Sequence, residues 1–200
     1  MTEAPLMSLL AEPFMQRALL GGMLTGALGG VLGSFAVLRK LSFFSDALGH
    51  SALLGITFGI IIGVNPILVL IPFAVLFALL VSHLVERSSL PTDALLNIVY
   101  SSSLAAAILL LSQVKSYRGG IQQLLFGDIL GISSLDLVVI SGLLVSTLIY
   151  LGISLRAQVL LTLNQDLAGA VGVNTRLHRL GFTLLLALVV AVSIKAVGVL

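Results

Sequence analysis

The chain has 200 residues, of which 58% are hydrophobic and only 9% are charged. Because a soluble domain carries about 25% charged residues, this composition excludes a water-soluble globular protein and indicates an integral membrane protein. The net charge of +2 gives no basis for nucleic acid as a partner, and the lack of cysteine excludes disulfides and thiolate metal sites.

Uncharged stretches predict about six membrane-spanning helices, since a helix needs about 20 apolar residues to cross a bilayer. The first span runs from Ala18 to Leu38, between Arg17 and Arg39. The uncharged stretch from Ser51 to Ser82 makes two spans, because Asn65-Pro66 disfavours helix and predicts a turn. Later spans are expected at residues 94–114, 137–155 and 180–194. The predicted fold class is therefore an all-α, polytopic transmembrane helical bundle.

The last of these spans runs towards Leu200 through "KAVGVL", without a cap, a loop or a polar end. A membrane protein seldom ends in such an apolar segment. We therefore expect residues 1–200 to form a single transmembrane domain that is incomplete at its C-terminus, with further spans beyond it.

Lysine and arginine residues predict the orientation of the chain, because they are enriched in cytoplasmic loops. Six of them are expected at one side of the membrane: Arg39, Lys40, Arg87, Arg156, Arg176 and Arg179. Three are expected at the other side: Arg17, Lys115 and Arg118. The first side should be the cytoplasm, which places the N-terminus outside.

The connection from Gly119 to Asp136 is too polar for a span and too apolar for a free loop. Irregular backbone survives at membrane depth only where protein or a water-filled cavity covers it. We expect a short helix here that lies on the outer surface or re-enters the membrane.

A second unusual connection, "NQDLAGAVGVNTRLHRL" at residues 164–180, lies on the predicted cytoplasmic side. Asn164 can cap a short helix and Gly172 can end it. The small residues of this segment leave room for a partner to approach closely.

Asp46 and His50 stand four residues apart in "SFFSDALGHSALLG", before a long apolar stretch. Side chains at this helical spacing face one direction, and a carboxylate with an imidazole suits Zn²⁺ or Mn²⁺. Two ligands are too few for tight binding, but an ion path needs releasable contacts. The alternative is structural: Asp46 is a first-turn acid favoured by the helix dipole, and His50 bonds to a backbone carbonyl.

The other ionisable residues near span ends have simpler structural interpretations. His83 is expected at a solvated interface, and His178 near lipid head groups or a partner. Asp128 follows a glycine and predicts a turn or cap. Asp93 and Asp136 are expected to start the spans that follow them.

Five stretches, in order, resemble the permease subunits of bacterial ATP-binding-cassette (ABC) importers for zinc, manganese or iron. The first contains "SDALGH", which resembles the Ser-Asp-Ala-Leu-small-His hallmark of that family. The next are "TDALLNIVYSSSLA", with Asn97 where the family often has glycine, and "LLFGDILGIS". The last two are residues 164–180, which resemble the coupling segment of the family, and "SIKAVGVL".

This resemblance implies a permease domain over residues 1–200, in a multi-pass protein of the bacterial plasma membrane that imports a divalent metal ion. It implies that Asp46 and His50 bind the ion as cargo, with no permanently bound cofactor. It also implies a homodimer in membrane lipid, an extracytoplasmic metal-binding protein and a cytoplasmic ABC ATPase. The residues implied to couple to the ATPase are Gln165, Asp166, Leu167, Ala168, Ala170, Val171, Gly172 and Val173.

The chain lacks a Gly-rich phosphate loop and cannot hydrolyse ATP itself, so we expect a transport subunit and not an enzyme. Two rival functions nevertheless remain open on the sequence. A small intramembrane enzyme is the first rival, but the spans lack a paired nucleophile and base. An importer of metal chelates, such as siderophores or cobalamin, is the second rival, and Asp46 with His50 argues for a bare ion instead.

Overall fold

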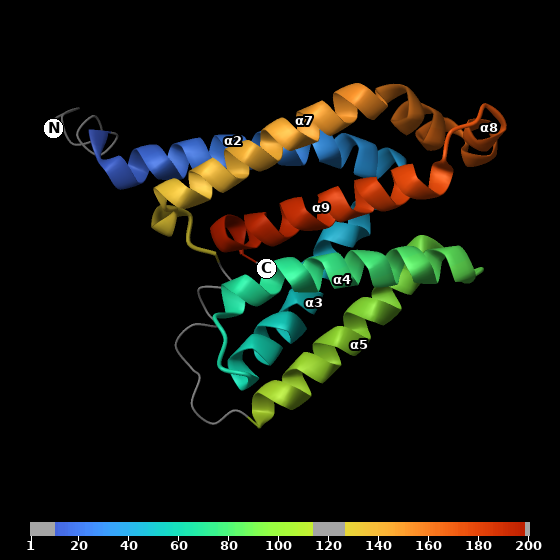
Figure 1. Ribbon diagram of the computed structural model, residues 1–200. Helices are drawn as coiled ribbons and strands as arrows, with labels where there is room; N and C mark the ends of the chain where they lie inside the picture. Colours follow the sequence, from blue (N-terminus) through green and yellow to red (C-terminus); the bar gives the residue numbers. More distant parts are fainter. Residues whose placement is uncertain (1–10, 114–126, 199–200) are drawn as a thin grey trace, which may run out of the picture.

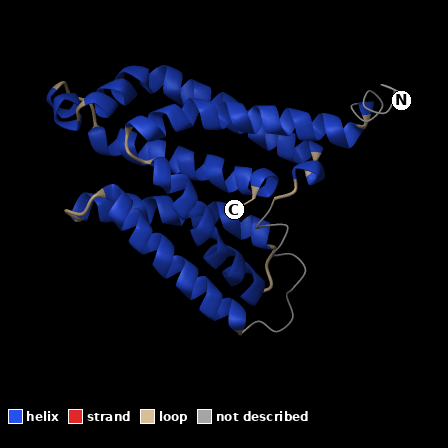
Figure 2. Ribbon diagram, turned by 180° about the vertical axis from the view of Figure 1, so that it is seen from behind, coloured by secondary structure: helices blue, strands red, loops and turns tan. Residues whose placement is uncertain are grey.

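The computed structural model describes residues 11–113 and 127–198, and within them the chain is helical with short connections (Figures 1 and 2). The elements are α2 (Pro13–Leu38), α3 (Ser42–Ile61), α4 (Pro66–Arg87), α5 (Thr92–Ser112), the 3₁₀ turn η1 (Ile129–Gly131), α7 (Ser134–Leu163), α8 (Gln165–Ala170) and α9 (Thr175–Val197). The predicted all-α fold is confirmed.

Six of these helices, of 20 to 30 residues each, are long and apolar enough to cross a membrane. This confirms the predicted number of spans, but five helices are longer than expected, and α2 and α4 each extend five residues beyond the predicted edge, to Pro13 and Arg87. Helix α3 begins at Ser42 instead of Ser51, α7 continues to Leu163 instead of Leu155, and α9 begins at Thr175. The cause is that charges mark the edge of the apolar layer and not the end of a helix. A helix of 30 residues is about 45 Å long, more than the ~30 Å hydrocarbon core.

The expected turn between the second and third spans is present at residues 62–65. Gly63 has a φ of +72°, and the amide of Val64 donates to the carbonyl of Gly59 at 2.9 Å. A φ of +72° suits glycine, which adopts positive φ without steric cost. Asn65-Pro66 therefore separates two spans as the sequence predicts.

Helix α3 lies at the centre of the bundle, where it packs against α4, α5 and α9. Helices α2 and α7 run side by side along α9 (Figures 1 and 2). The largest fully buried side chains include Phe44 of α3 and Phe182 of α9. The ring of Phe44 meets that of Phe77 on α4 edge-on, with 5.6 Å between centroids. The functional candidates on α3 are thus held from several sides.

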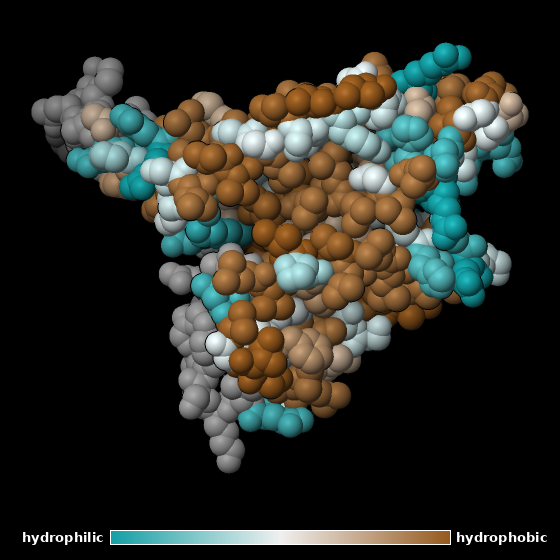
Figure 3. Space-filling model, in the orientation of Figure 1, coloured by the Kyte–Doolittle hydropathy of each residue, from teal (hydrophilic) through white to brown (hydrophobic). Residues whose placement is uncertain are grey.

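The face of the bundle seen in Figure 3 is apolar over its middle and hydrophilic towards its ends. Large hydrophobic side chains are open on the bundle, such as Met23 of α2 at 69% and Ile153 of α7 at 85% exposure. In water such a surface would aggregate, whereas in a bilayer it faces lipid tails. The surface therefore agrees with a membrane-embedded bundle.

The glycines of α2 pack closely against a neighbour at one end only. A Cβ on Gly21 would lie 2.5 Å from Ile132, and one on Gly22 would lie 3.6 Å from Ile129. At Gly21 the missing side chain lets Ile132 pack against the backbone of α2. Four further glycines of α2 have no atom within 4 Å of a Cβ position: Gly26, Gly29, Gly30 and Gly33.

The segment expected to form a surface or re-entrant helix is described only from Gly127 onwards. Its first part, residues 119–126, lies outside the described residues. The remainder is the 3₁₀ turn η1, which packs on α2, and Ile132 beside it is only 2% exposed. The described part therefore holds one short 3₁₀ helix against the bundle before α7 begins at Ser134, and the expected surface or re-entrant helix stays a prediction.

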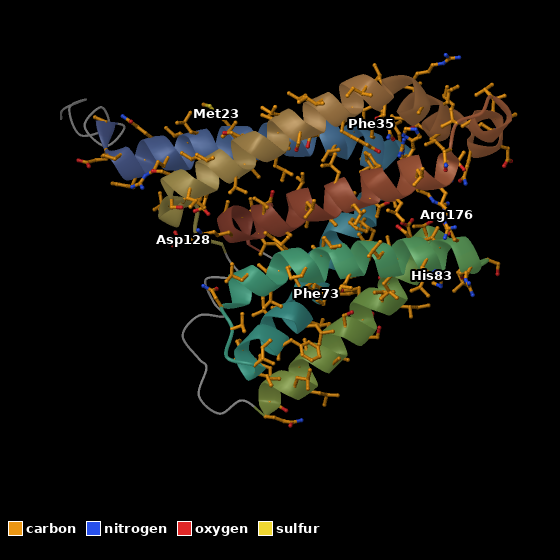
Figure 4. The ribbon with its side chains drawn as sticks, viewed as in Figure 1. Met23, Phe35, Phe73, His83, Asp128 and Arg176 are labelled. Atoms are coloured by element: carbon orange, nitrogen blue, oxygen red, sulfur yellow. The ribbon has the colours of Figure 1, made fainter. Side chains whose placement is uncertain are left out.

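The two ends of the bundle differ in the contacts that they carry. At one end Arg39 reaches Thr162 at 3.1 Å, and Arg179 pairs with Glu86 at 2.7 Å. At the other end Lys195 pairs with Asp136 at 2.6 Å. Figure 4 shows His83 and Arg176 at the first end and Asp128 at the second. The first end is the one predicted to face the cytoplasm.

This orientation can be tested with single cysteines, because the natural chain contains none. We expect Ser89→Cys and Thr175→Cys to resist a membrane-impermeant thiol reagent in intact cells. Val64→Cys, in the exposed turn at the opposite end, should be labelled readily and serves as the control. Labelling of the first two positions with protection of the third would reverse the orientation.

Candidate metal path and coupling segment

The pair formed by Asp46 and His50 lies inside α3 and not at its beginning. The helix starts at Ser42, and its first turn contains no acidic residue. Asp46 is therefore one turn further in, where the helix dipole gives it little stabilisation. The dipole interpretation of Asp46 was wrong, because Asp46 does not lie in the first turn.

The imidazole of His50 is held in a defined position by two neighbours. Its Nδ1 lies 3.0 Å from the carbonyl oxygen of Asp46 and 3.4 Å from Oδ1 of the same residue. A carbonyl only accepts, so Nδ1 is the donor in this contact, and in the neutral ring Nε2 is the nitrogen that keeps its lone pair. The ring also stands edge-on to Tyr100 of α5, with 5.0 Å between centroids.

These contacts satisfy the structural interpretation of His50, and both polar contacts are made by Nδ1, so Nε2 is not used in them. A metal-bound histidine usually donates its other N–H to a carbonyl or carboxylate, which is the arrangement found here. The side chain of His50 is 18% exposed and that of Asp46 is 52% exposed. The pair can thus offer one nitrogen and one carboxylate to an ion at the surface of α3.

Within the described ranges, no group of three or more His, Cys, Asp or Glu side chains could hold a metal ion. The other candidates have the structural roles that the sequence predicted. The side chain of Asp128 accepts from the amide of Gly131 at 2.8 Å, which caps η1. Asp93 lies in the first turn of α5, and Asp136 forms a capping box with Ser133. His83 is exposed near the end of α4.

The short helix α8 has the boundaries that its sequence predicts. Asn164 caps it by accepting from the amides of Asp166 at 2.9 Å and Leu167 at 3.1 Å. Gly172 follows the helix with a φ of +82°, and the amide of Val173 donates back to the carbonyl of Ala168 at 3.0 Å. This closing pattern, with glycine in the left-handed region, is a Schellman motif.

Most of the expected coupling residues are open to a partner. Leu167 and Val171 are 54% and 55% exposed. Ala168 has no exposed surface, so it anchors α8 to the bundle and cannot meet a partner. Val173 is half-buried, and the remaining expected residues are exposed: Gln165, Asp166, Ala170 and Gly172.

A polar cluster around Arg39 was missed in the sequence. Its guanidinium reaches the last turns of α7, where Gln158 is fully buried and Thr162 accepts a hydrogen bond. The signal was available: Tyr150, Ser154, Gln158 and Thr162 are polar residues spaced four apart. Such spacing places them on one face of a helix.

The six apolar helices, with charged residues gathered at their ends, define a polytopic integral membrane protein. The profile of the ABC 3 transport family matches residues 11–200. The chain belongs to this family, as the sequence resemblance implied, and is a multi-pass permease protein of the bacterial plasma membrane.

Two relatives and one solved structure are informative. The chain is 35% identical over 186 residues to the high-affinity zinc uptake system membrane protein ZnuB of Haemophilus influenzae, covering 92% of this chain and 70% of the relative. It is 30% identical over 185 residues to the manganese import system permease protein ScaB of Streptococcus gordonii, covering 92% and 66%. The structure of PsaBC from Streptococcus pneumoniae in complex with Fab superposes with a TM-score of 0.79 at 27% identity, covering 99% and 72%.

Proposed function

We propose that the chain is the permease subunit of an ATP-driven ABC importer that moves a divalent metal ion into the cytoplasm. Zinc and manganese are the cargoes in the names of the two relatives. Iron is a third candidate from the sequence resemblance. The observation that carries the proposal is the Asp46–His50 pair, which places an imidazole beside a half-exposed carboxylate on a membrane-spanning helix.

The physical requirement for such a pair is the cost of moving an ion through an apolar layer. A bare divalent ion in a low-dielectric interior loses its hydration, and polar protein groups must replace the lost water. Imidazole and carboxylate suit zinc and manganese, and two ligands bind weakly enough to release the ion. We propose that Asp46 and His50 are a transient station on the path and not a storage site.

The proposal includes partners, because one α3 helix supplies only this one pair. A homodimer would bring a second copy of Asp46 and His50 to the path. The four glycines of α2 without neighbours, Gly26, Gly29, Gly30 and Gly33, leave room for close packing with another helix. Residues 1–200 would act as one transmembrane permease domain in the longer protein that its relatives represent.

The energy source would be a separate cytoplasmic ATPase that docks on α8. The exposed apolar side chains of Leu167 and Val171 support this role, since they lie on the side of the bundle predicted to face the cytoplasm. An extracytoplasmic metal-binding protein would deliver the ion to the opposite end, where Asp136 and Lys195 are paired. Neither the docking of the ATPase nor the delivery of the ion requires a catalytic residue in this chain.

The growth of a deletion strain tests the proposed function. We expect a bacterium that lacks this permease to grow normally in rich medium and poorly when a chelator lowers free zinc or manganese. Adding back the one transported ion should restore growth. A strain that responds only to a siderophore or to cobalamin would favour the chelate importer, and a strain indifferent to metal would contradict the proposal.

A further inference from the structure

Arg39 connects three helices at the end of the bundle that carries α8. Its Nη2 donates to the carbonyl of Gln158 at 2.8 Å and also to Oε1 of the same residue. Its Nε donates to the hydroxyl of Thr162 at 3.1 Å. The guanidinium carbon lies 4.5 Å from the ring centre of Phe182 on α9, which is a cation–π contact. Arg39 is thus attached to α7 and α9 at once.

The cluster continues through side chains that are themselves hydrogen-bonded. Nε2 of the fully buried Gln158 donates to the hydroxyl of Tyr150 at 2.7 Å. The hydroxyl of Tyr150 donates in turn to the carbonyl of His178 on α9 at 3.1 Å. The ring of Phe35, labelled in Figure 4, packs edge-on against Phe182 with 6.4 Å between centroids. The cluster therefore fixes α7 and α9 relative to the end of α2.

The charge of Arg39 is satisfied without a carboxylate, since none of the ion pairs among the described residues includes it. Burial lowers the pKa of Arg39 below its usual value, although the guanidinium keeps its charge in proteins. Among the described residues its contacts are oxygen atoms of α7 and the ring of Phe182. Because a half-buried charge loses stabilisation without these partners, a movement of α7 or α9 favours a movement of Arg39 with them.

Arg39 is also part of the three-residue turn that leads from α2 into α3. The turn is closed by hydrogen bonds: Leu41 donates to the carbonyl of Ala36 at 2.8 Å, and Phe44 donates to that of Leu41 at 2.9 Å. A shift of Arg39 is therefore carried into the first turn of α3. Asp46 lies about 6 Å further along the helix axis.

On the other side of Arg39 lies the elbow between α7 and α8, which we define as residues Thr162 to Gln165. Thr162 bonds to Arg39, while Asn164 caps α8. The elbow borders a cavity of about 490 Å³ that Arg39, Thr162, Asn164 and Gln165 help to line. The elbow therefore has unfilled space beside it.

We propose that Arg39 is a coupling residue, which transmits the position of the α7–α8 elbow to the start of α3 and so to Asp46 and His50. The inference rests on the proposed function, because it needs an ATPase at α8 and an ion at α3. The proposed order of events has three steps. Movement of the ATPase shifts α8, and the α7–α8 elbow then moves Arg39. The turn that contains Arg39 finally reorients Asp46 and His50.

The test is the number of metal ions imported per ATP hydrolysed, in proteoliposomes that hold the full-length permease, its ATPase and its metal-binding protein. Arg39→Gln should still bind the ATPase and hydrolyse ATP, but import about tenfold fewer ions per ATP, within the usual range of coupling energies. Arg39→Lys should behave similarly, because an ammonium cannot reach Gln158 and Thr162 as a fork. The matched control is Lys40→Gln, which removes the same charge from an exposed neighbour and should leave the ratio unchanged.

The possible outcomes distinguish a failure of the Arg39 coupling role from a failure of the proposed metal-import function. A wild-type ratio in Arg39→Gln, or loss of ATPase binding in that variant, would overturn the coupling role. If Arg39→Gln does not insert into the membrane, Thr162→Val takes its place, because valine keeps the shape and removes the acceptor. A wild-type number of ions imported per ATP in Thr162→Val would then also overturn the coupling role of Arg39. A wild-type complex that imports no metal would instead contradict the proposed function.

Discussion

Replacing His50 with alanine should abolish metal uptake at limiting metal while the protein still inserts into the membrane and binds its ATPase. The variant removes the only nitrogen ligand of the Asp46–His50 pair, whose Nδ1–H is held by the carbonyl of Asp46 at 3.0 Å. Loss of even a group that orients a metal ligand costs about 10–100-fold, so loss of the ligand itself should cost at least as much. The measurement is the initial rate of radioactive zinc or manganese uptake by intact cells.

Two further variants make this result specific. His83→Ala removes an exposed histidine near the end of α4 and should leave uptake unchanged. Asp46→Asn keeps the shape of an exposed side chain and removes only its charge, so it should lose uptake without loss of protein. Normal uptake by His50→Ala would show that the ring serves only to pack against Tyr100, and the metal path would then lie elsewhere.

Replacing Ala170 with arginine should detach the ATPase and stop uptake, with no effect on membrane insertion. Ala170 ends the exposed helix α8 beside Val171, and a long charged side chain there would block a partner that packs on small residues. Placing charge against a desolvated apolar contact costs several kcal/mol, or about a hundredfold or more in affinity. The direct measurement is recovery of the ATPase with the affinity-purified permease from detergent extracts.

The matched control for this variant is Ser89→Arg. Ser89 is exposed in the connection between α4 and α5, at the same end of the bundle, and its replacement adds the same charge. It should retain the ATPase and normal uptake. If the Ala170→Arg protein still co-purifies with its ATPase, α8 is not the docking site, whatever happens to transport.

The spans could be predicted because the bilayer imposes a strong rule on composition. Uncharged stretches identified all six, and Asn65-Pro66 identified the turn between α3 and α4. The caps of α8 were also readable, since Asn164 and Gly172 act through local geometry. Both kinds of signal depend on neighbouring residues and not on the packing of distant helices.

Helix ends were less predictable, since a charge does not end a helix. Arg156 lies inside α7 and Arg176 lies inside α9, where both helices continue beyond the apolar layer. For the same reason Asp46 and His50 were placed before a span and are found within α3.

Contacts between distant segments could not be derived from the sequence. Nothing local places Tyr100 against His50, and Arg39 lies 119 residues from Gln158 along the chain. The spacing of polar residues on α7 could have predicted a polar face there, but not the guanidinium that meets it. These contacts arise from helix packing, which brings Tyr100 to the ring of His50 and Arg39 to the last turns of α7.

The most direct test of the account is ATP-driven ion import by the full-length permease, reconstituted in proteoliposomes with its ATPase and metal-binding protein. We predict that free zinc or manganese accumulates inside only when ATP is supplied on the cytoplasmic side, and that Asp46→Asn abolishes this accumulation. Accumulation of a ferric siderophore or cobalamin in place of the free ion, or free-ion import that persists in Asp46→Asn, would contradict the account.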